Sequence, residues 1–502
     1  MVLRKQFWRF AVAAIAAFLV NACGSSGDSQ VKVVVIGEPD DPFESGVRLS
    51  AAGQLVRAAT VEGLVAFDEQ GRIVPALADR WIVTDDGQSY IFRLRDGTWR
   101  DGSELNAKVA ARSLRSAIEA LRGTPLGLDL ASVDEVREMA GRVVEIRLSH
   151  PAPYLLQLLA QPEMGLTHGG SGGGPMRLER EGEVAMLTPI PPVELGLPDI
   201  SHWDDRARAV SLSAAGGKEA VDRFNEGEAD LVLGGRISTF PYTSSVGILR
   251  GTIQLDPVEG LFGLQVMSSR GFLSDETNRE ALALAIDRDA LIAPFGVAGW
   301  TARADIAASL PADAQGGPDA AGSQGQARWA GLSLAQRRAN AKARVATWRQ
   351  GRNGGDGAPA LSVWLPAGPG SDLLFTRLKQ DFASIGVELS RAKKDETGDL
   401  RLLDVVARYP RPVWYYNRFN CTMSKNACSP EADGALAAAL KASDPAARAE
   451  LIRKARDVLT EANIFIPFGS PIRWSLVRGD ATGFAANAWG WHPLMPMAMR
   501  PK

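Results

Sequence analysis

Few side chains of this 502-residue chain have the types and spacing that catalysis needs. The segment Gly169-Gly170-Ser171-Gly172-Gly173 matches the G-x-S-x-G pattern of serine hydrolases. In those enzymes the serine lies on a sharp turn between a strand and a helix. Here glycines and Pro175 follow Ser171, so no helix can begin beside it. The pattern is therefore typical of a flexible linker.

The histidines do not form a catalytic or metal-binding pattern either. They are scattered, with no H-E-x-x-H motif and no His-x-His pair: His150, His168, His202 and His492. The chain also lacks a Gly-Lys-Ser/Thr loop of the Walker type, so we do not expect it to hydrolyse ATP. We predict a protein that is not an enzyme and that uses no cofactor or metal. A catalytic pair of carboxylates is the alternative, because such a pair has no sequence motif by which it could be recognised.

The three cysteines fit an exported protein. Cys421 and Cys428 flank the short loop TMSKNA, which could close as a disulfide in an oxidising compartment. Two free thiols are the alternative, and a metal site is disfavoured because no histidine is near in the sequence.

The N-terminus has the build of a secretory signal peptide over residues 1–22, with Arg4, Lys5 and Arg9 before an apolar centre. It ends in Val20-Asn21-Ala22-Cys23, which resembles a bacterial lipobox whose cysteine is lipidated. An ordinary signal with an incidental Cys23 is the alternative. Residues 23–30 are then a polar tether, and we expect a lipid-anchored protein of the periplasm or cell envelope.

Composition limits the class of protein. Hydrophobic residues make up 45% and charged residues 23% of the chain, as in ordinary globular proteins. The net charge of -2 gives no basic excess for a nucleic-acid partner. No run after the signal is long and apolar enough to cross a membrane. The chain is too long for one compact core, so two or three lobes are expected.

The elements that must position any site are most clearly marked between Val61 and Ile118. Asp86-Gly87 stands between two apolar runs, and Asp-Gly supplies the positive φ that a tight hairpin turn needs. Residues 67–71 predict a second, Gly-containing hairpin loop. From Ala107 the apolar residues recur at helical spacing.

This stretch resembles the peptide/nickel-type solute-binding proteins of ABC importers, family 5. The family pattern is met at Glu62-Gly63-Leu64, Asp68, Gly71, Pro75, Leu77-Ala78, Trp81, Asp86-Gly87, Tyr90, Phe92, Leu94-Arg95-Asp96-Gly97 and Asp101-Gly102. A second family signature, R-x-A-x-x-x-A-I-D-R-x-x-L-I, is met at Arg279, Ala281, Ala285-Ile286-Asp287-Arg288 and Leu291-Ile292. Residues 278–292 predict an amphipathic helix with a break near Asp287.

The resemblance implies an α/β fold of the periplasmic-binding-protein type (type II), a two-lobed Venus flytrap with an extra α/β domain. We expect residues 31–60, 175–260 and 470–502 to form lobe I, residues 61–174 the extra domain II, and residues 261–469 lobe III. The glycine-rich residues 165–175 are predicted to be a mobile crossing between lobes.

The resemblance also indicates where ligand binds. Peptide-binding members often carry W-x-A-D-Y-P-D-P, whose first Asp can receive the amino group of the ligand. Residues 405–412 keep Tyr409 and both prolines, but Arg408 and Arg411 stand at the two acidic positions. Because arginine repels an amine and holds a carboxylate or phosphate, we hypothesise that the ligand presents an anionic or neutral group to Arg408. The alternative is that both arginines pair with carboxylates of the protein.

Other candidate ligand contacts are ambiguous. Trp414, Tyr415 and Tyr416 could form an aromatic wall over a ligand or simply belong to the core. Glu38 follows the apolar strand 31–36, whose end meets the cleft in the family, but a solvated turn carboxylate is the alternative. Trp489 and Trp491 could likewise contact a ligand or belong to the core.

These implications predict a monomeric substrate-binding lipoprotein of an ABC importer. It would capture peptides or similar small solutes and deliver them to a membrane permease driven by an ATPase. The alternative is a lipoprotein receptor or chaperone that uses the same fold without transport, and a hydrolase is the least favoured reading.

Overall fold

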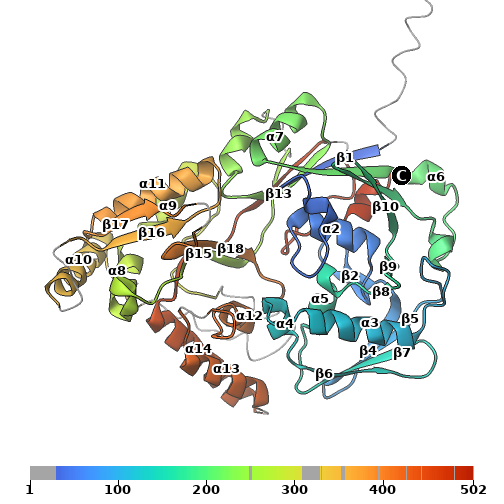
Figure 1. Ribbon diagram of the computed structural model, residues 1–502, viewed down its shortest axis with the longest axis horizontal. Coiled ribbons are helices and arrows are strands. Elements are labelled where there is room, and N and C mark those ends of the chain that lie inside the picture. The colour runs from blue at the N-terminus through green and yellow to red at the C-terminus, as the bar shows by residue number, and fades with distance from the viewer. Residues whose placement is uncertain are drawn as a thin grey trace, which may run out of the picture.

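The computed structural model describes residues 30–500, except 248–251, 308–327, 330, 352–356, 394–395, 425–426, 443 and 480. The predicted signal peptide, the lipidation site Cys23 and the tether up to residue 29 lie outside the described residues. The described chain forms three groups of strands and helices that surround the central helix α2, Ala51–Thr60 (Figure 1).

The first group is built on a seven-stranded sheet of order β10-β11-β12-β1-β13-β20-β14. Its strands are β1 Gln30–Ile36, β10 Met176–Glu181, β11 Val184–Pro189, β12 Ala209–Ala215, β13 Leu231–Arg236, β14 Ile253–Leu255 and β20 Arg473–Val477. The apolar run predicted as a buried strand is the central strand β1, which pairs in parallel with β12 and β13.

Side chains alternate across β1, as the period of a strand requires. Val31, Val33 and Val35 pack with α2 and with α15 (Leu494–Ala498) on one face of the sheet. Val34 faces the other side, which α7 (Gly217–Glu226) covers. Both faces of the sheet are therefore closed by helices.

The second group contains the stretch that the sequence marks most clearly. Its antiparallel sheet has the order β4-β5-β7-β6, with β4 Ala78–Val83, β5 Ser89–Leu94, β6 Val133–Glu138 and β7 Val143–Leu148. A hairpin of β2 (Val65–Phe67) and β3 (Ile73–Pro75) and the helices α3 (Ala107–Ala120), α4 (Pro125–Asp129) and α5 (Leu155–Leu159) complete it. The two expected hairpin turns form, with positive φ at Gly71 and Gly87.

The third group surrounds a five-stranded sheet of order β17-β16-β18-β15-β19. The strands are β15 Gly260–Val266, β16 Ala360–Trp364, β17 Glu388–Arg391, β18 Leu400–Val406 and β19 Phe465–Gly469. Its helices include α8 Glu276–Ala285, α9 Arg288–Ile292, α10 Leu334–Gln350, α11 Pro369–Ala383, α12 Pro412–Asn417, α13 Pro430–Lys441 and α14 Pro445–Ala462. The helix break predicted near Asp287 is present between α8 and α9.

The glycine-rich segment between the first two groups is packed, and this corrects the expectation of a mobile crossing. Gly172, Gly173 and Gly174 are buried, and the Gly174 N–H donates to the Thr60 carbonyl oxygen at 3.1 Å. A Cβ on Gly174 would lie 2.4 Å from the Thr60 carbonyl carbon. Two crossing strands of chain thus run side by side, and the glycines permit their close approach.

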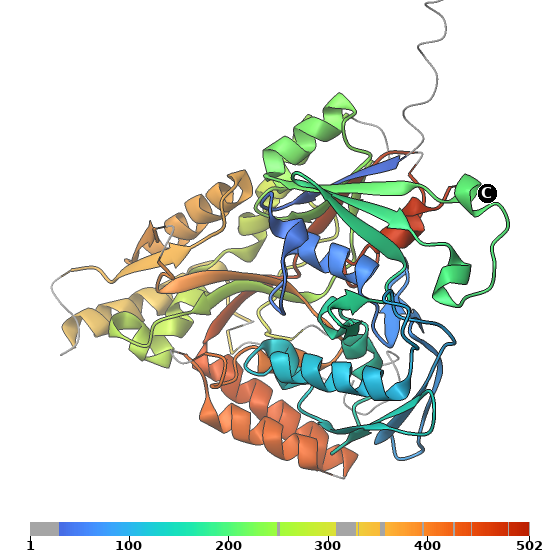
Figure 2. The ribbon, with the colours of Figure 1, turned by 45° about the vertical axis from the view of Figure 1, so that its right-hand side comes forward.

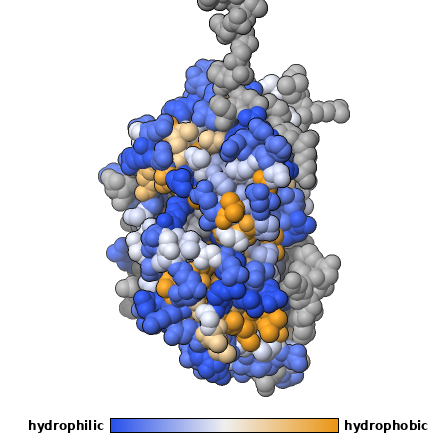
Figure 3. All heavy atoms as spheres, turned by 90° about the vertical axis from the view of Figure 1, so that its right-hand side faces the viewer, coloured by the Kyte–Doolittle hydropathy of each residue, from blue (hydrophilic) through white to orange (hydrophobic). Residues whose placement is uncertain are grey.

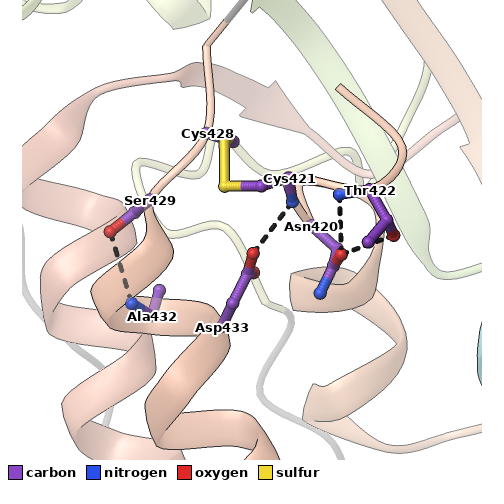
Figure 4. Close-up of a disulfide and its surroundings, with 7 residues drawn as sticks. All are labelled: Asn420, Cys421, Thr422, Cys428, Ser429, Ala432 and Asp433. Atoms are coloured by element: carbon purple, nitrogen blue, oxygen red, sulfur yellow. Dashed lines mark hydrogen bonds between the residues drawn. A yellow bond between two sulfur atoms is a disulfide. The ribbon is translucent and has the colours of Figure 1, made fainter. Parts of the chain in front are cut away.

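Cys421 and Cys428 are joined as a disulfide, with their Cα atoms 5.1 Å apart (Figure 4). The Asp433 carboxylate of α13 accepts a hydrogen bond from the Cys421 N–H at 2.9 Å, and Ser429 caps the start of the same helix. The disulfide therefore ties the segment after α12 to the beginning of α13.

The face of the molecule that lies on the right in Figure 1 is mainly hydrophilic, with separate hydrophobic patches (Figure 3). Within the described part of the chain, no helix combines the length and the hydropathy that a membrane span needs. Seen from a second direction, the three groups keep their arrangement around α2 (Figure 2).

Candidate functional site

A cavity of about 270 Å³ lies where the three groups meet, and we call it the interlobe cleft. It is lined by Ala51, Gln54, Phe67, Gln161, Pro162, Gly234, Arg236, Val405, Val406, Ala407, Arg408, Arg418, Arg473, Trp489, Gly490 and Trp491. A ligand held in the cleft would therefore contact all three groups at once.

Strand ends position the polar residues of the cleft. Arg236 is the last residue of β13, and Arg408 follows closely after the end of β18. The carboxyl ends of strands from two different sheets thus meet at the cleft, a common place for ligands in α/β proteins.

The first polar cluster, which we call the Arg408 corner, contains Arg408, Glu163, Arg418 and Asp129. Arg408 donates to both carboxylate oxygens of Glu163, at 2.8 and 3.1 Å, and to the Gln161 amide oxygen at 2.9 Å. Glu163 belongs to the short helix Pro162–Met164 of the second group. The alternative that Arg408 pairs with a protein carboxylate is therefore the arrangement in the structure.

The protonation of this pair follows from burial and charge. Burial by itself raises the pKa of Glu163, but the charge and hydrogen bonds of Arg408 outweigh it and hold the pKa below its ordinary value. Burial lowers the pKa of Arg408, but the charge and hydrogen bonds of Glu163 raise it by more, so the pKa of Arg408 lies above its ordinary value. Both groups are therefore charged and bonded at neutral pH.

Asp129 of α4 is the second carboxylate of the Arg408 corner. Its Oδ1 accepts hydrogen bonds from the Tyr409 hydroxyl at 3.1 Å and from the Asn417 amide at 3.0 Å. Arg418 lies 4.0 Å from its Oδ2. Burial raises the pKa of Asp129 in spite of these partners, and burial lowers the pKa of Arg418 to about 10.

Aromatic stacking completes this contact between the second and third groups. The rings of Tyr154 and Tyr409 lie parallel, with centroids 4.1 Å apart. Helices α4 and α12 lie side by side at the same place (Figure 1). The Arg408 corner is therefore a buried joint between the second and third groups as well as one wall of the cleft.

The second polar cluster, the Arg236 corner, contains Arg236, Arg473 and Asp404. Arg473 at the start of β20 donates to the Asp404 carboxylate at 2.6 Å and to the Asp404 carbonyl oxygen at 3.0 Å. Arg236 donates to the same carbonyl oxygen at 2.9 Å. Its side chain is exposed to the cleft, and the nearby charge of Arg473 lowers the pKa of Arg236.

Two tryptophans form the apolar wall of the cleft. The Asn487 side-chain oxygen accepts from the backbone N–H groups of Trp489 and Trp491, and its amide donates to the Trp491 carbonyl oxygen. The Trp489 indole N–H donates to the Gly71 carbonyl oxygen at 2.9 Å. Because that N–H is already bonded, the Trp489 ring offers the cleft an apolar surface.

The other residues named as candidate contacts lie away from the cleft. Tyr409, Trp414, Tyr415 and Tyr416 are almost completely buried, which favours their interpretation as core. Arg411 is also buried and is not among the lining residues. Glu38 is exposed in the turn after β1, where its backbone N–H donates to Asp41, so it resembles a solvated turn carboxylate.

The sequence analysis missed Arg236, Arg418 and Arg473. The position of Arg236 at the end of a strand was the available signal, since strand ends tend to meet ligands. Nothing local marks the other two. Over the described residues, no group of three or more His, Cys, Asp or Glu side chains could hold a metal ion.

The sequence and the fold of this chain are similar to those of known solute-binding proteins. Residues 72–188 match the family model "Bacterial extracellular solute-binding proteins, family 5 Middle". The periplasmic oligopeptide-binding protein OppA of Escherichia coli is 22% identical over 471 residues, which are 85% of this chain and 84% of OppA. The structure of Haemophilus influenzae OppA in complex with the peptide RPPGFSPFR superimposes with a TM-score of 0.77 at 17% identity, covering 94% of this chain and 100% of that chain.

Residues 72–188 belong to the family 5 extracellular solute-binding proteins, and the likeness to OppA extends over 85% of this chain. The expected α/β, two-lobed type II fold is confirmed. Two of its relatives are named as periplasmic binding proteins. A further relative is the probable deoxycholate-binding periplasmic protein YgiS of Escherichia coli, 31% identical over 121 residues. That match covers only 20% of this chain and 23% of YgiS.

Proposed function

We propose that this family 5 protein captures a small solute in the interlobe cleft, closes around it and delivers it to an ABC permease. One observation carries the proposal: the cleft is lined by residues from all three groups of elements. A ligand bound there stabilises the arrangement in which the three walls approach each other, so occupancy is coupled to shape. The permease would recognise that shape, and its ATPase would supply the energy.

We further propose that the three groups correspond to lobe I, domain II and lobe III with the bounds predicted from the sequence. The Arg408 corner joins domain II to lobe III, so its contacts would form or tighten as the lobes close. In this proposal Arg408 serves closure, and its pairing with Glu163 keeps that carboxylate from receiving the amino group of a peptide.

The N-terminal lipobox supports a further proposal on location. We propose that Cys23 carries a lipid and that the folded body lies outside the cytoplasm as a monomer, at the surface of a membrane. Replacement of Cys23 by Ala should release the protein from the membrane fraction without changing solute binding. A variant that stays with the membranes would contradict the anchor and leave the binding role intact.

The test of capture is to identify what the folded body retains. Mass spectrometry of the protein without its first 23 residues, purified under mild conditions, should show one solute class at close to one molecule per chain. Ala51→Trp, which fills the cleft from the first turn of α2, should abolish this retention. Ala446→Trp, on the exposed start of α14, is the matched control and should retain solute.

The same experiment separates the alternatives. Retained solute that is released unchanged supports binding, whereas its conversion to product would favour a hydrolase. Co-isolation of the full chain with a permease and an ATPase supports import. Stable capture without such partners would favour a receptor or chaperone that uses the same fold.

A further inference from the structure

The charges that line the interlobe cleft are of one sign. The described lining residues include four arginines, Arg236, Arg408, Arg418 and Arg473, and neither an aspartate nor a glutamate. The carboxylates that balance them, Glu163, Asp129 and Asp404, lie behind this lining. A solute in the cleft therefore meets guanidinium groups before it meets any carboxylate.

The balance is incomplete at the Arg236 corner. Two arginines share Asp404 there, and the carboxylate itself bonds Arg473, whereas Arg236 reaches only the carbonyl oxygen. Over the described residues, no carboxylate lies within ion-pair distance of Arg236. Arg236 and Arg473 donate to the same Asp404 carbonyl oxygen, at 2.9 and 3.0 Å, so two positive charges are close together, and the charge of Arg473 lowers the pKa of Arg236. An anion placed beside them would relieve that repulsion.

An apolar surface lies next to these charges. Trp489 and Trp491 flank Gly490, which has no side chain and whose backbone has a positive φ. A Cβ at Gly490 would lie 3.4 Å from the Arg473 Cγ, so the Trp-Gly-Trp segment rests on the stem of that arginine. Cations and aromatic faces are therefore adjacent in one wall.

We propose that the cleft selects organic anions, solutes with a carboxylate or phosphate group held at Arg236 and a flat apolar body against Trp489 and Trp491. This inference rests on the proposed function, because it assigns a solute class to the same cleft. Arginine suits either oxyanion, since its planar fork can donate two parallel hydrogen bonds.

The test compares small peptides of similar size that carry different charges. N-acetyl-Phe-Trp with a free carboxylate, its C-terminal amide, and Phe-Trp amide with a free amine carry one negative, no and one positive charge. Isothermal titration calorimetry should show the acid binding about tenfold tighter than the neutral amide, with the amine weakest. N-acetyl-phosphoseryl-Trp amide serves as the phosphate arm, and its affinity relative to the acid assigns the preferred oxyanion.

Variants locate the selectivity. Arg236→Gln should reduce the affinity for the acid to that for the amide, whereas Arg236→Lys should keep part of the preference because it keeps the charge. Arg122→Gln, an exposed arginine that pairs with Glu119 on α3, is the matched control and should change nothing. Thermal unfolding of each variant confirms that it folds.

Three results would overturn the inference. Equal binding of the three charge forms, or tightest binding of the amine, would show that the cleft binds solute without selecting anions, which leaves the proposed function standing. Absence of binding by every probe would reject this solute class. The proposed function itself would then be judged by the mass spectrometry of retained solute, which does not depend on the charge of the probes.

Discussion

Arg408 and Arg236 line the same cleft but differ in their surroundings. Arg408 is bonded to both oxygens of a carboxylate from another lobe, and 23% of its side chain is exposed. Arg236 is exposed to the cleft and meets only a backbone carbonyl oxygen that Arg473 shares. The comparison indicates that the number and origin of carboxylate partners decide whether an arginine holds lobes together or is available to a ligand.

The energetic consequence of this difference is testable. A buried, paired charge becomes costly when its partner is removed, because the remaining charge has lost its compensation. An exposed charge without a carboxylate can be removed with little effect on folding. Substitutions in the Arg408 corner should therefore destabilise the protein more than substitutions in the Arg236 corner.

Removal of the carboxylate in Glu163→Gln should cause the largest loss. We expect the free energy of unfolding to fall by about 3 kcal/mol at pH 7, since Arg408 keeps its charge in a largely buried place. Chemical denaturation measures this change. Glu219→Gln, an exposed residue that pairs with Arg223 on α7, should lose at most about 0.5 kcal/mol.

The effect of Glu163→Gln should also depend on pH. Because the pKa of Glu163 is lowered in the folded protein, the pair stabilises the fold above pH 4.5, and this contribution is lost as pH falls through the lowered pKa. The difference between wild type and variant should therefore shrink below pH 4.5. A difference that stays constant down to pH 3 would show that the ion pair is not its source.

Tyr409→Phe should have an intermediate effect. The substitution removes one of the two hydrogen bonds that Asp129 Oδ1 accepts and keeps the stacking on Tyr154. We expect a loss of about 1.5 kcal/mol in the free energy of unfolding. Tyr90→Phe, which removes a buried bond to the neutral Ala152 carbonyl, is the comparison and should lose about 1 kcal/mol. Equal or larger losses at Tyr90 would argue against a special role for the joint.

Asp129→Asn should act in the opposite direction. Burial raises the pKa of Asp129, so this group favours folding below its ordinary value of 3.8, and that contribution is lost as pH rises through the raised pKa. The amide keeps an acceptor for Tyr409 and removes the buried charge. We expect the variant to be slightly more stable than wild type at pH 7, with a gain that disappears toward pH 4. A variant that is less stable at pH 7 would show that attraction to Arg418 outweighs burial.

Arg236→Gln should have the smallest effect on folding. Its exposed side chain contributes one hydrogen bond to Asp404, and its removal relieves repulsion with Arg473, so the free energy of unfolding should change by less than about 0.5 kcal/mol. The same denaturation series measures it. A loss as large as that of Glu163→Gln would remove the distinction between the two corners.

Local signals predicted much of the scaffold. The hairpin turns at Gly71 and Gly87, the buried strand β1 and the break between α8 and α9 formed where the sequence indicated them. Each depends on a few neighbouring residues, through turn chemistry or side-chain period. The glycine-rich crossing was misjudged because its glycines serve close packing against Thr60, a contact that no local pattern reveals.

The family resemblance, the fold class and the turns can be predicted from short, regularly spaced motifs. Which arginines are paired and which face the cleft depends on contacts between distant parts of the chain. Glu163 lies 245 positions from Arg408 in the chain, and Arg236 lies 168 positions from Asp404. Charges become partners through the packing of lobes, and that packing is fixed by the whole core.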